Sequence, residues 1–179
     1  MDNIKVSAVK VSAKIPETDL RIVEKFCEQN VIPTRRFNKD HLVVYDTSYT
    51  YTFFKKSQTS FADQHVNITK LQTTDLTAAI EDLAWLIDQE PKYIFSEIDN
   101  ITATGNIDKQ IDLQDFIDNN QDIVDFITYN PERFPGLFVR GKNGKVILFR
   151  SGKMVFVGCK TLNQIDNLNK WMLERCVNI

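Results

Sequence analysis

The sequence predicts an α+β fold made of two similar halves, each reading strand, helix, three or more strands and helix. Residues 129–160 carry three consecutive strands joined by short turns, and the same order of elements occurs about 95 residues earlier. Matched phenylalanines mark the halves: Phe37 corresponds to Phe134, and Phe54 to Phe149. Because the strand runs are longer than the helices can cover, we expect one continuous antiparallel sheet with helices on one face and the other face open to a partner.

In the first half, residues 4–15 alternate between apolar and polar side chains, which predicts a half-buried strand that Pro16 ends. Apolar residues at helical spacing predict a helix over residues 17–30. Segments rich in β-branched and aromatic residues predict further strands over 42–45, 49–54 and 59–68. Thr74 is the predicted N-cap of a second helix over residues 75–88.

In the second half, residues 93–107 are predicted to form a strand with a turn near Thr104 and Gly105. A helix with an Asp-rich outer face is predicted to start near Asp112, and Thr161 is predicted to cap the last helix. The strands between them are predicted at 134–140, 145–149 and 154–159, with turns at Asn143-Gly144 and Ser151-Gly152. We therefore expect a first repeat over residues 1–90 and a second over 91–179, together forming one intertwined structural unit.

The composition is that of an ordinary soluble globular protein, with 42% hydrophobic and 26% charged residues in a chain of 179. No apolar run reaches the roughly 18 residues that a membrane span needs, and the alternating N-terminus is unlike a secretion signal. Cys27, Cys159 and Cys176 are scattered, which indicates a reducing intracellular compartment and neither a disulfide framework nor a zinc site. Two histidines and no Gly-rich phosphate loop predict no catalytic set, no metal centre and no cofactor.

Charge is strongly polarised along the second half, although the net charge of the chain is only −2. Residues 92–132 contain two basic and nine acidic residues, a local sum of −7, whereas residues 133–175 contain nine basic and two acidic residues, a local sum of +7. The basic stretch coincides with the three predicted strands, and a basic sheet with exposed aromatic residues suits a nucleic-acid backbone and its bases. From these residues alone, a solvated antiparallel meander with ordinary surface lysines is the alternative.

Three segments of the second half resemble the TATA-box-binding protein family: FSEIDNITATGNID at 95–108, YNPERFPGL at 129–137 and ILFRSGKMVFVGCK at 147–160. They occur in the family's order and close to its spacing, and the resemblance is specific over residues 91–175 and weaker over 4–90. It implies a saddle-shaped fold of two pseudo-symmetric repeats with helices on the convex face and no enzymatic activity. It also implies minor-groove binding and bending of AT-rich, TATA-like promoter DNA, a property taken from the family and not deduced from these residues.

The resemblance assigns roles to individual residues. Two pairs of phenylalanines would wedge open base steps: Phe37 with Phe54, and Phe134 with Phe149. The side chains implied to contact the minor groove are Asn100, Ile147, Val155, Val157 and Val6, and Val157 replaces a usual threonine. Phosphate contacts are implied for Arg140, Lys153 and Lys160.

The resemblance also implies partners: double-stranded promoter DNA, a transcription factor IIB-like protein, the RNA polymerase machinery and further initiation factors of a preinitiation complex. The contact with the B-type factor corresponds to Asn130, Glu132 and Arg133, of which only Glu132 keeps the family's residue type, so we expect a modified partner surface. The implied location is the nucleus, or a cytoplasmic viral factory if the chain is viral.

The first half departs further from the family pattern. Its asparagine position holds Ile4, with Asn3 one residue away and so on the opposite strand face. The family's basic positions read Val43, Gln58 and His65, and two groove positions read Ser60 and Ala62. Fewer cations mean fewer phosphate contacts, so we expect the second repeat to dominate DNA binding. Two other interpretations stay open: an interaction scaffold or regulator that keeps this fold but has lost most DNA binding, and an accessory domain of a nuclease or glycosylase.

Overall fold

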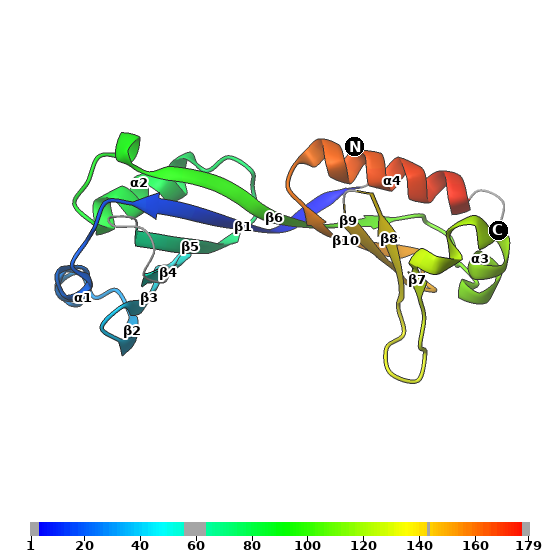
Figure 1. Ribbon diagram of the computed structural model, residues 1–179, viewed down its shortest axis with the longest axis horizontal. Coiled ribbons are helices and arrows are strands. Elements are labelled where there is room, and N and C mark those ends of the chain that lie inside the picture. Colours follow the sequence, from blue (N-terminus) through cyan, green and yellow to red (C-terminus); the bar gives the residue numbers. More distant parts are fainter. Residues whose placement is uncertain (1–3, 56–63, 143, 177–179) are drawn as a thin grey trace. The chain divides into compact units, whose positions relative to one another are not determined.

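The computed structural model of the chain describes residues 4–55, 64–142 and 144–176. Its strands follow the order β2-β3-β4-β5-β1-β6-β10-β9-β8-β7 in one sheet, accompanied by helices, so the α+β class predicted from the sequence is confirmed. Two compact units make up the chain: an N-terminal unit, Ala8–Asp99, and a C-terminal unit, Asn100–Ile179 together with Met1–Ser7 (Figure 1). Strands β1 (Lys5–Ile15) and β6 (Phe95–Asn106) are therefore each shared between the units. That residues 1–90 and 91–179 are diverged repeats stays a prediction.

The N-terminal unit places a helix before and after a run of antiparallel strands. Its further elements are α1 (Leu20–Gln29), β2 (Thr34–Asn38), β3 (His41–Tyr45), β4 (Thr50–Lys55), β5 (Gln64–Leu71), α2 (Thr77–Leu86) and the 3-10 helix η1 (Pro91–Tyr93). The register sets His41 opposite Phe54 and Phe54 opposite His65. One row of side chains therefore crosses β3, β4 and β5 on a single face.

The other face of these strands is buried beneath α1 and α2. Alternate residues of β1 are buried there, namely Val9, Val11, Ala13 and Ile15. The helices contribute buried Leu20, Val23 and Cys27 from α1, and Ala79 and Leu83 from α2. The hydroxyl of the buried Tyr51 donates a hydrogen bond of 3.2 Å to the backbone oxygen of Ala79, and burial raises the pKa of Tyr51 far above its ordinary value. In each unit we call the side of the strands away from the helices the open face.

The C-terminal unit has the same layering around one long helix. Its further elements are α3 (Leu113–Asn119), η2 (Gln121–Phe126), β7 (Ile127–Thr128), β8 (Leu137–Gly141), β9 (Gly144–Leu148), β10 (Lys153–Cys159) and α4 (Leu162–Cys176). Helix α4 packs along β9 and β10 (Figure 1) and buries Ile165, Leu168 and Met172. A Cβ at Gly141 would lie 2.5 Å from Cδ1 of Leu168, so glycine here lets the helix approach the strands closely.

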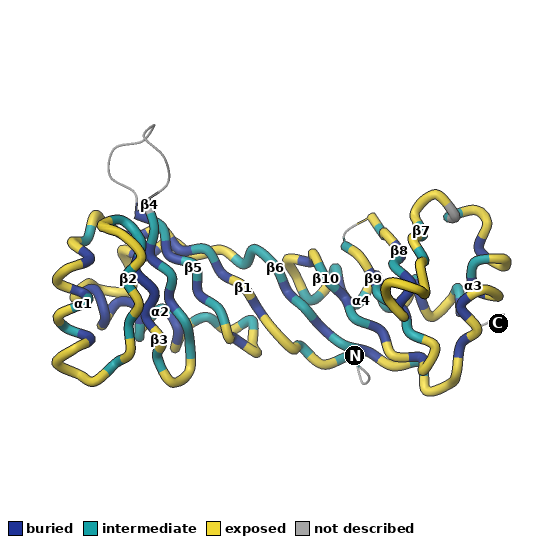
Figure 2. The backbone as a smooth tube through the Cα atoms, turned by 90° about the horizontal axis from the view of Figure 1, so that it is seen from below, coloured by how far each residue is buried: buried dark blue, intermediate teal, exposed yellow. Residues whose placement is uncertain are grey.

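Burial alternates along the strands of the C-terminal unit, as the dark blue and teal segments of β6 and β10 show (Figure 2). In β10, Met154, Phe156 and Cys159 are buried, while Val155 and Val157 are half-buried on the other side. Burying a side chain as large as Met154 or Phe156 contributes about 1.5–3 kcal/mol relative to full exposure. The half-buried Val155 and Val157 lie on the other side of β10 and belong to a surface that the helices leave uncovered.

Helix starts agree with the sequence at two of three predicted positions. Asp112 caps α3 by accepting from the backbone N–H groups of Gln114 and Asp115, and this lowers the pKa of Asp112. Thr161 caps α4, since its Oγ1 accepts from the N–H of Gln164 at 3.2 Å. The prediction for Thr74 is wrong: the carboxylate of Asp75 accepts from the N–H of Thr77 at 3.0 Å, and α2 begins only there.

Strand positions differ from the sequence prediction in a few places. Strand β6 is continuous through Thr104 and Gly105, because Gly105 pairs with Met154 and the predicted turn does not form. Ile127 begins the short strand β7 and does not extend the preceding helix, since it pairs with Val139 of β8. Asn143 of the predicted hairpin turn and residues 56–63 of the first half lie outside the described residues.

The three thiols are free and buried, at Cys27, Cys159 and Cys176. Burial raises the pKa of Cys27 and of Cys176 to about 11, which keeps both protonated at neutral pH. Among the helices of residues 4–55, 64–142 and 144–176, none combines the length and apolar character needed to cross a bilayer.

Candidate nucleic-acid interface

An apolar strip runs across the open face of the C-terminal unit. The register aligns Thr104 of β6, Val155 of β10, Ile147 of β9 and Phe138 of β8 in one row. The three hydrophobic members of this row are half-buried, as is Val157 one step further along β10. The sequence predictions for Ile147, Val155 and Val157 thus fall on one continuous surface, and Phe138 joins them although it lies outside the segments that carry the family resemblance.

Two predicted wedge residues, Phe134 and Phe149, meet at the edge of this strip. Their ring centroids lie 5.9 Å apart with the planes at 63°, an edge-to-face arrangement, and Phe134 also lies 5.2 Å from Phe138. Phe134 is 37% exposed and lies in the turn before β8, not within the strand that the sequence predicted. The rings are therefore on the open face and not in the core beneath α4.

Gly136 lies directly against the rings of Phe134 and Phe149. A Cβ at this position would lie 2.6 Å from Cε1 of Phe134, 2.7 Å from Cγ2 of Ile147 and 3.0 Å from Cε1 of Phe149. Any larger residue must push the rings aside, so glycine fixes where they stand. The motif FPG contains this residue, but its contact with Phe149 becomes visible only in three dimensions.

Asn100 is held on the open face by two hydrogen bonds. Its Oδ1 accepts from the backbone N–H of Gly158 at 2.7 Å, and its Nδ2 donates to Oγ1 of Thr102 at 3.2 Å. A bulge in β10 between Phe156 and Cys159 brings the Gly158 amide to this position, with Gly158 at a φ of 83°. An amide nitrogen carries two hydrogens, so one N–H of Asn100 remains for a ligand.

Cations flank the apolar strip. Arg140 and Lys145 face each other across the β8–β9 hairpin, and both are exposed. Lys153 lines a hollow of about 340 Å³ together with Lys5 of β1, a residue to which the family resemblance gives no role. Within the described part of the chain, the side chains of Arg140, Lys145 and Lys153 form no ion pair, and the exposed Lys160 lies just before α4. These unpaired charges are available for an anionic partner.

The three residues predicted for a partner protein occupy one turn. The backbone oxygen of Asn130 accepts from the N–H groups of Arg133 at 3.1 Å and Phe134 at 3.0 Å. This turn exposes the side chains of Asn130, Glu132 and Arg133. The same backbone turn therefore positions both the wedge residue Phe134 and the predicted protein contact.

The open face of the N-terminal unit carries a different row, in which phenylalanine and histidine alternate. Phe37 is 50% exposed and stacks on His41 at 4.7 Å, and Phe54 stacks on His65 at 5.9 Å. The guanidinium of Arg35 lies 4.6 Å from the centre of the Phe37 ring. Both predicted wedge residues of this half thus lie on the open face, each against an imidazole and not against the other.

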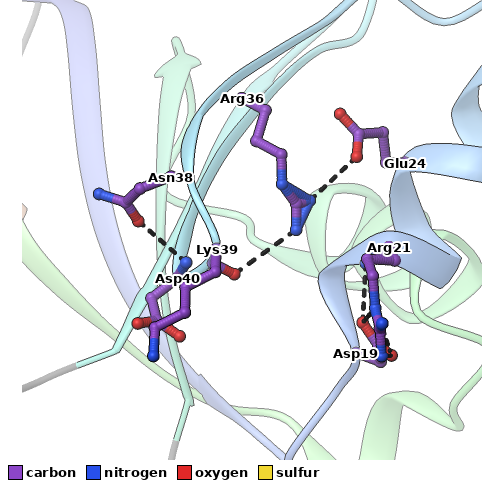
Figure 3. A network of polar contacts seen from close by, with 7 residues as sticks. All are labelled: Asp19, Arg21, Glu24, Arg36, Asn38, Lys39 and Asp40. Atoms are coloured by element: carbon purple, nitrogen blue, oxygen red, sulfur yellow. Dashed lines mark hydrogen bonds and ion pairs between the residues drawn. The ribbon is translucent and has the colours of Figure 1, made fainter.

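A polar network beside α1 fixes the strand that carries Phe37 (Figure 3). Arg36 points toward α1 and pairs with Glu24 at 2.9 Å, whereas Phe37 stacks on His41 on the open face. Asn38 closes the following turn by accepting from the N–H of Asp40 at 2.9 Å. At the start of α1, the hydrogen bond from Arg21 lowers the pKa of the capping Asp19 to about 2.

Only some of the first-half residues that correspond to family site positions lie in the described part of the chain. Val43 is buried to 7% exposure within the sheet, and Val6 of β1 is half-buried. Asn3, Gln58, Ser60 and Ala62 lie outside the described residues. Among the residues that are described, no cluster of three or more potential metal ligands occurs.

Comparison with known proteins finds a family that part of the chain resembles. The model of the family described as "Transcription factor TFIID (or TATA-binding protein, TBP)" matches residues 96–175. Residues 96–175, 80 of the 179 residues, are therefore similar to the TATA-box-binding protein family. The TATA-box-binding protein of Aeropyrum pernix is 39% identical over 80 residues, which are 44% of this chain and 37% of the relative. That of Pyrococcus abyssi is 34% identical over 84 residues, 46% of this chain and 42% of the relative. The matched part thus spans about two fifths of the curated relatives.

The fold of that family extends to the whole chain. The structure of "Methanococcus jannaschii TBP" superposes with a TM-score of 0.76 at 22% identity, covering 99% of each chain. The predicted fold of the TATA-box-binding protein is therefore confirmed for both halves, including the half whose sequence falls outside the family match. Proteins of this family are transcription factors and not enzymes.

Proposed function

We propose that this chain is a transcription initiation factor that binds AT-rich promoter DNA through the minor groove and bends it. The open face of the C-terminal unit carries this proposal, because it combines an apolar strip, a phenylalanine pair at the strip's edge and unpaired cations beside it. Apolar side chains suit the floor of a widened minor groove, and the cations suit phosphates on its rim. The match of residues 96–175 to the TATA-box-binding protein family model supports the same proposal.

The phenylalanine pair would supply the bend. Phe134 and Phe149 would insert at a base step and unstack it, at a cost of a few kcal/mol, which apolar contact with Ile147 and Val155 would offset. Asn100 would donate its remaining N–H to the acceptors that A·T and T·A pairs both present. The contact would therefore distinguish A·T from G·C pairs but not A·T from T·A.

The two units would contribute unequally. The C-terminal unit would supply Arg140, Lys153 and Lys160 to phosphates, whereas the corresponding positions of the first half hold no lysine or arginine. Phe37 and Phe54 would act as the second wedge of the family, after losing their stacking on His41 and His65. We propose that a transcription factor IIB-like protein contacts the turn of Asn130, Glu132 and Arg133 and that the RNA polymerase machinery follows. The site of action would be the nucleus or, for a viral chain, a cytoplasmic factory.

A bend assay on a TATA-containing duplex tests the proposal. Energy transfer between dyes at the duplex ends is compared for the wild-type chain and for Phe134→Ala/Phe149→Ala, at a protein concentration that saturates binding. We expect the double substitution to reduce bending strongly while leaving some salt-dependent affinity. Phe126→Ala is the matched control, because Phe126 is 53% exposed in the same unit but lies in η2, outside the strands.

Three results would contradict the proposal. The wild-type chain could fail to bind the duplex even at low salt, it could bind without bending it, or Phe126→Ala could reduce bending as much as the double substitution does. Absence of binding would instead favour the second candidate, an interaction scaffold with this fold. The carboxylates Glu97 and Asp99 on the N-terminal unit favour that candidate, because they would repel phosphates.

A further inference from the structure

The N-terminal unit contains a pocket that shares only Phe54 with the proposed DNA contact. It has a volume of about 830 Å³ and lies on the open face, between the ends of β1, β4, β5 and β6. Phe54, Tyr93 and Phe95 contribute aromatic walls, and Glu97, Asp99 and Lys14 contribute charges. A pocket of this size accommodates several side chains of a bound peptide.

The aromatic walls are unusually accessible for residues of their type. Phe95 is 73% exposed and Tyr93 is 49% exposed, although both lie next to the buried Ile94. Large apolar side chains left in contact with water around a cavity mark a binding site more often than a free surface. The ring of Tyr93 already has the ammonium of Lys92 at 5.0 Å from its centre, which shows that cations are accommodated at this rim.

The charges of the pocket favour a cationic ligand. Glu97 is exposed, and it forms no ion pair or hydrogen bond with any described residue. Asp99 is only partly neutralised: it accepts from the Ser12 hydroxyl at 2.5 Å, and Lys10 lies 3.5 Å away. Lys14 is the one lysine or arginine among the pocket-lining residues described, and because Lys10 pairs with Asp99, Glu97 supplies the unpaired carboxylate. Such a surface repels nucleic-acid phosphates and attracts a basic group.

We propose that this pocket binds arginine side chains from a basic segment of a protein partner. A guanidinium stacks on aromatic faces and donates paired hydrogen bonds to a carboxylate, so it uses both Phe95 and Glu97 at once. This pocket of the N-terminal unit would thus bind protein, whereas the apolar strip of the C-terminal unit would bind DNA. This inference goes beyond the proposed function and stands whether or not DNA binds.

The test uses the full chain and two synthetic peptides. One carries two arginines between glycine and serine residues, and the other replaces both arginines by citrulline, which keeps the shape and removes the charge. We expect the arginine peptide to bind at least about tenfold more tightly at low salt, by calorimetry. Amide chemical shifts of Ser96 and Glu97 should move on titration. Equal binding of the two peptides, or no binding of either, would overturn the proposal.

Substitutions of opposite sign make the test specific to the pocket. Glu97→Gln and Phe95→Ala should each weaken the arginine peptide about tenfold, while Lys14→Ala should strengthen it by removing a like charge. Glu81→Gln is the matched control, because Glu81 is exposed on α2 of the same unit and outside the pocket. If the pocket bound nucleic acid instead, Glu97→Gln would strengthen and Lys14→Ala would weaken the binding of a single-stranded oligonucleotide. Weakening by Lys14→Ala together with binding of that oligonucleotide would therefore reject the protein ligand.

Discussion

The backbone N–H of Gly158 donates to Oδ1 of Asn100 across the bulge in β10, at 2.7 Å. This bond fixes the orientation of the amide, because only the oxygen can accept a hydrogen bond. The nitrogen is thereby directed to Thr102 and to the open face. The oxygen of Asn100 thus anchors the side chain, and its nitrogen can donate to a ligand. A substitution can remove the donor and keep the anchor.

Asn100→Asp should keep the fold and lose the DNA contact. The carboxylate still accepts from Gly158, but it replaces the donor with a negative charge where the minor groove presents acceptors. We expect thermal unfolding close to wild type and DNA affinity at least about tenfold weaker in a gel-shift titration. Asn167→Asp adds the same charge at an exposed site on α4 and should change neither. A loss of affinity shared by both variants would indicate a general charge effect instead.

Gly136→Ala should disturb the wedge without opening the core. The added Cβ would lie 2.6 Å from the Phe134 ring, 2.7 Å from Cγ2 of Ile147 and 3.0 Å from the Phe149 ring, so the rings and the Ile147 side chain beside them must shift. We expect a reduced bend angle in the energy-transfer assay and weaker ring-to-ring nuclear Overhauser effects. Gly141→Ala is the counterpart on the helix side, since its Cβ meets Leu168. That variant should lower the melting temperature and keep the bend; the opposite pattern would refute the assignment of Gly136.

Removing cations should affect the two units differently. Arg140→Ala with Lys153→Ala should lower DNA affinity and reduce the slope of log K against log salt by about 1.8, or roughly 0.9 for each lost phosphate contact. Arg35→Ala with Lys14→Ala removes two exposed cations from the N-terminal unit and should change the slope much less. Binding is measured by fluorescence anisotropy at a series of salt concentrations. Equal changes of slope would show that the units share the phosphate contacts.

The pair between Asp122 and Arg175 should stabilise the chain in a pH-dependent way. Arg175 donates to both carboxylate oxygens at 2.7 Å and to Asn120 at 3.0 Å, and its hydrogen bonds hold the pKa of Asp122 below the ordinary 3.8. A carboxylate whose pKa is lowered by folding stabilises the folded state at pH values above its pKa in the unfolded chain. This contribution is lost as the pH falls through the pKa of the carboxylate in the folded chain.

Asp122→Asn should therefore melt below wild type at pH 6, and the gap should close as the pH falls below about 4. The measurement is a series of thermal unfolding curves at decreasing pH. Asp125→Asn removes an exposed carboxylate nearby that has no ion pair among the described residues, and it should show no such gap. A difference that persists unchanged at pH 2.5 would mean that the pair does not act through the charge of Asp122.

The hairpin strands could be predicted from the sequence because their signals are local. The alternation along β9 and β10 and the turn residues between them predict both strands to within a residue or two. Strand β2 could not be predicted in this way, since Thr34, Arg35 and Arg36 show no apolar alternation. Arg36 occupies the helix side through its ion pair with Glu24, a contact between elements that no pattern within the strand reveals.

The candidate site likewise has a part that local sequence predicts and a part that it does not. Sequence motifs predict Phe134 and Phe149 as wedge residues, and the structure has both on the open face. Gly136 under the rings, Phe138 beside them and Lys5 beside Lys153 depend on register between strands. A single sequence does not specify that register beyond the hairpin turns.

The sharing of β1 and β6 between the units limits how this chain can be taken apart. Ser7 hydrogen-bonds to the backbone of Thr102 at 3.0 Å, and β1 neighbours β6 in the sheet. A fragment that began at residue 91 would leave the edge of β6 bare, and a bare edge recruits strands from other copies. We therefore expect a fragment of residues 91–179 to be insoluble on its own. A soluble fragment would also need residues 4–7, which supply the neighbouring part of β1.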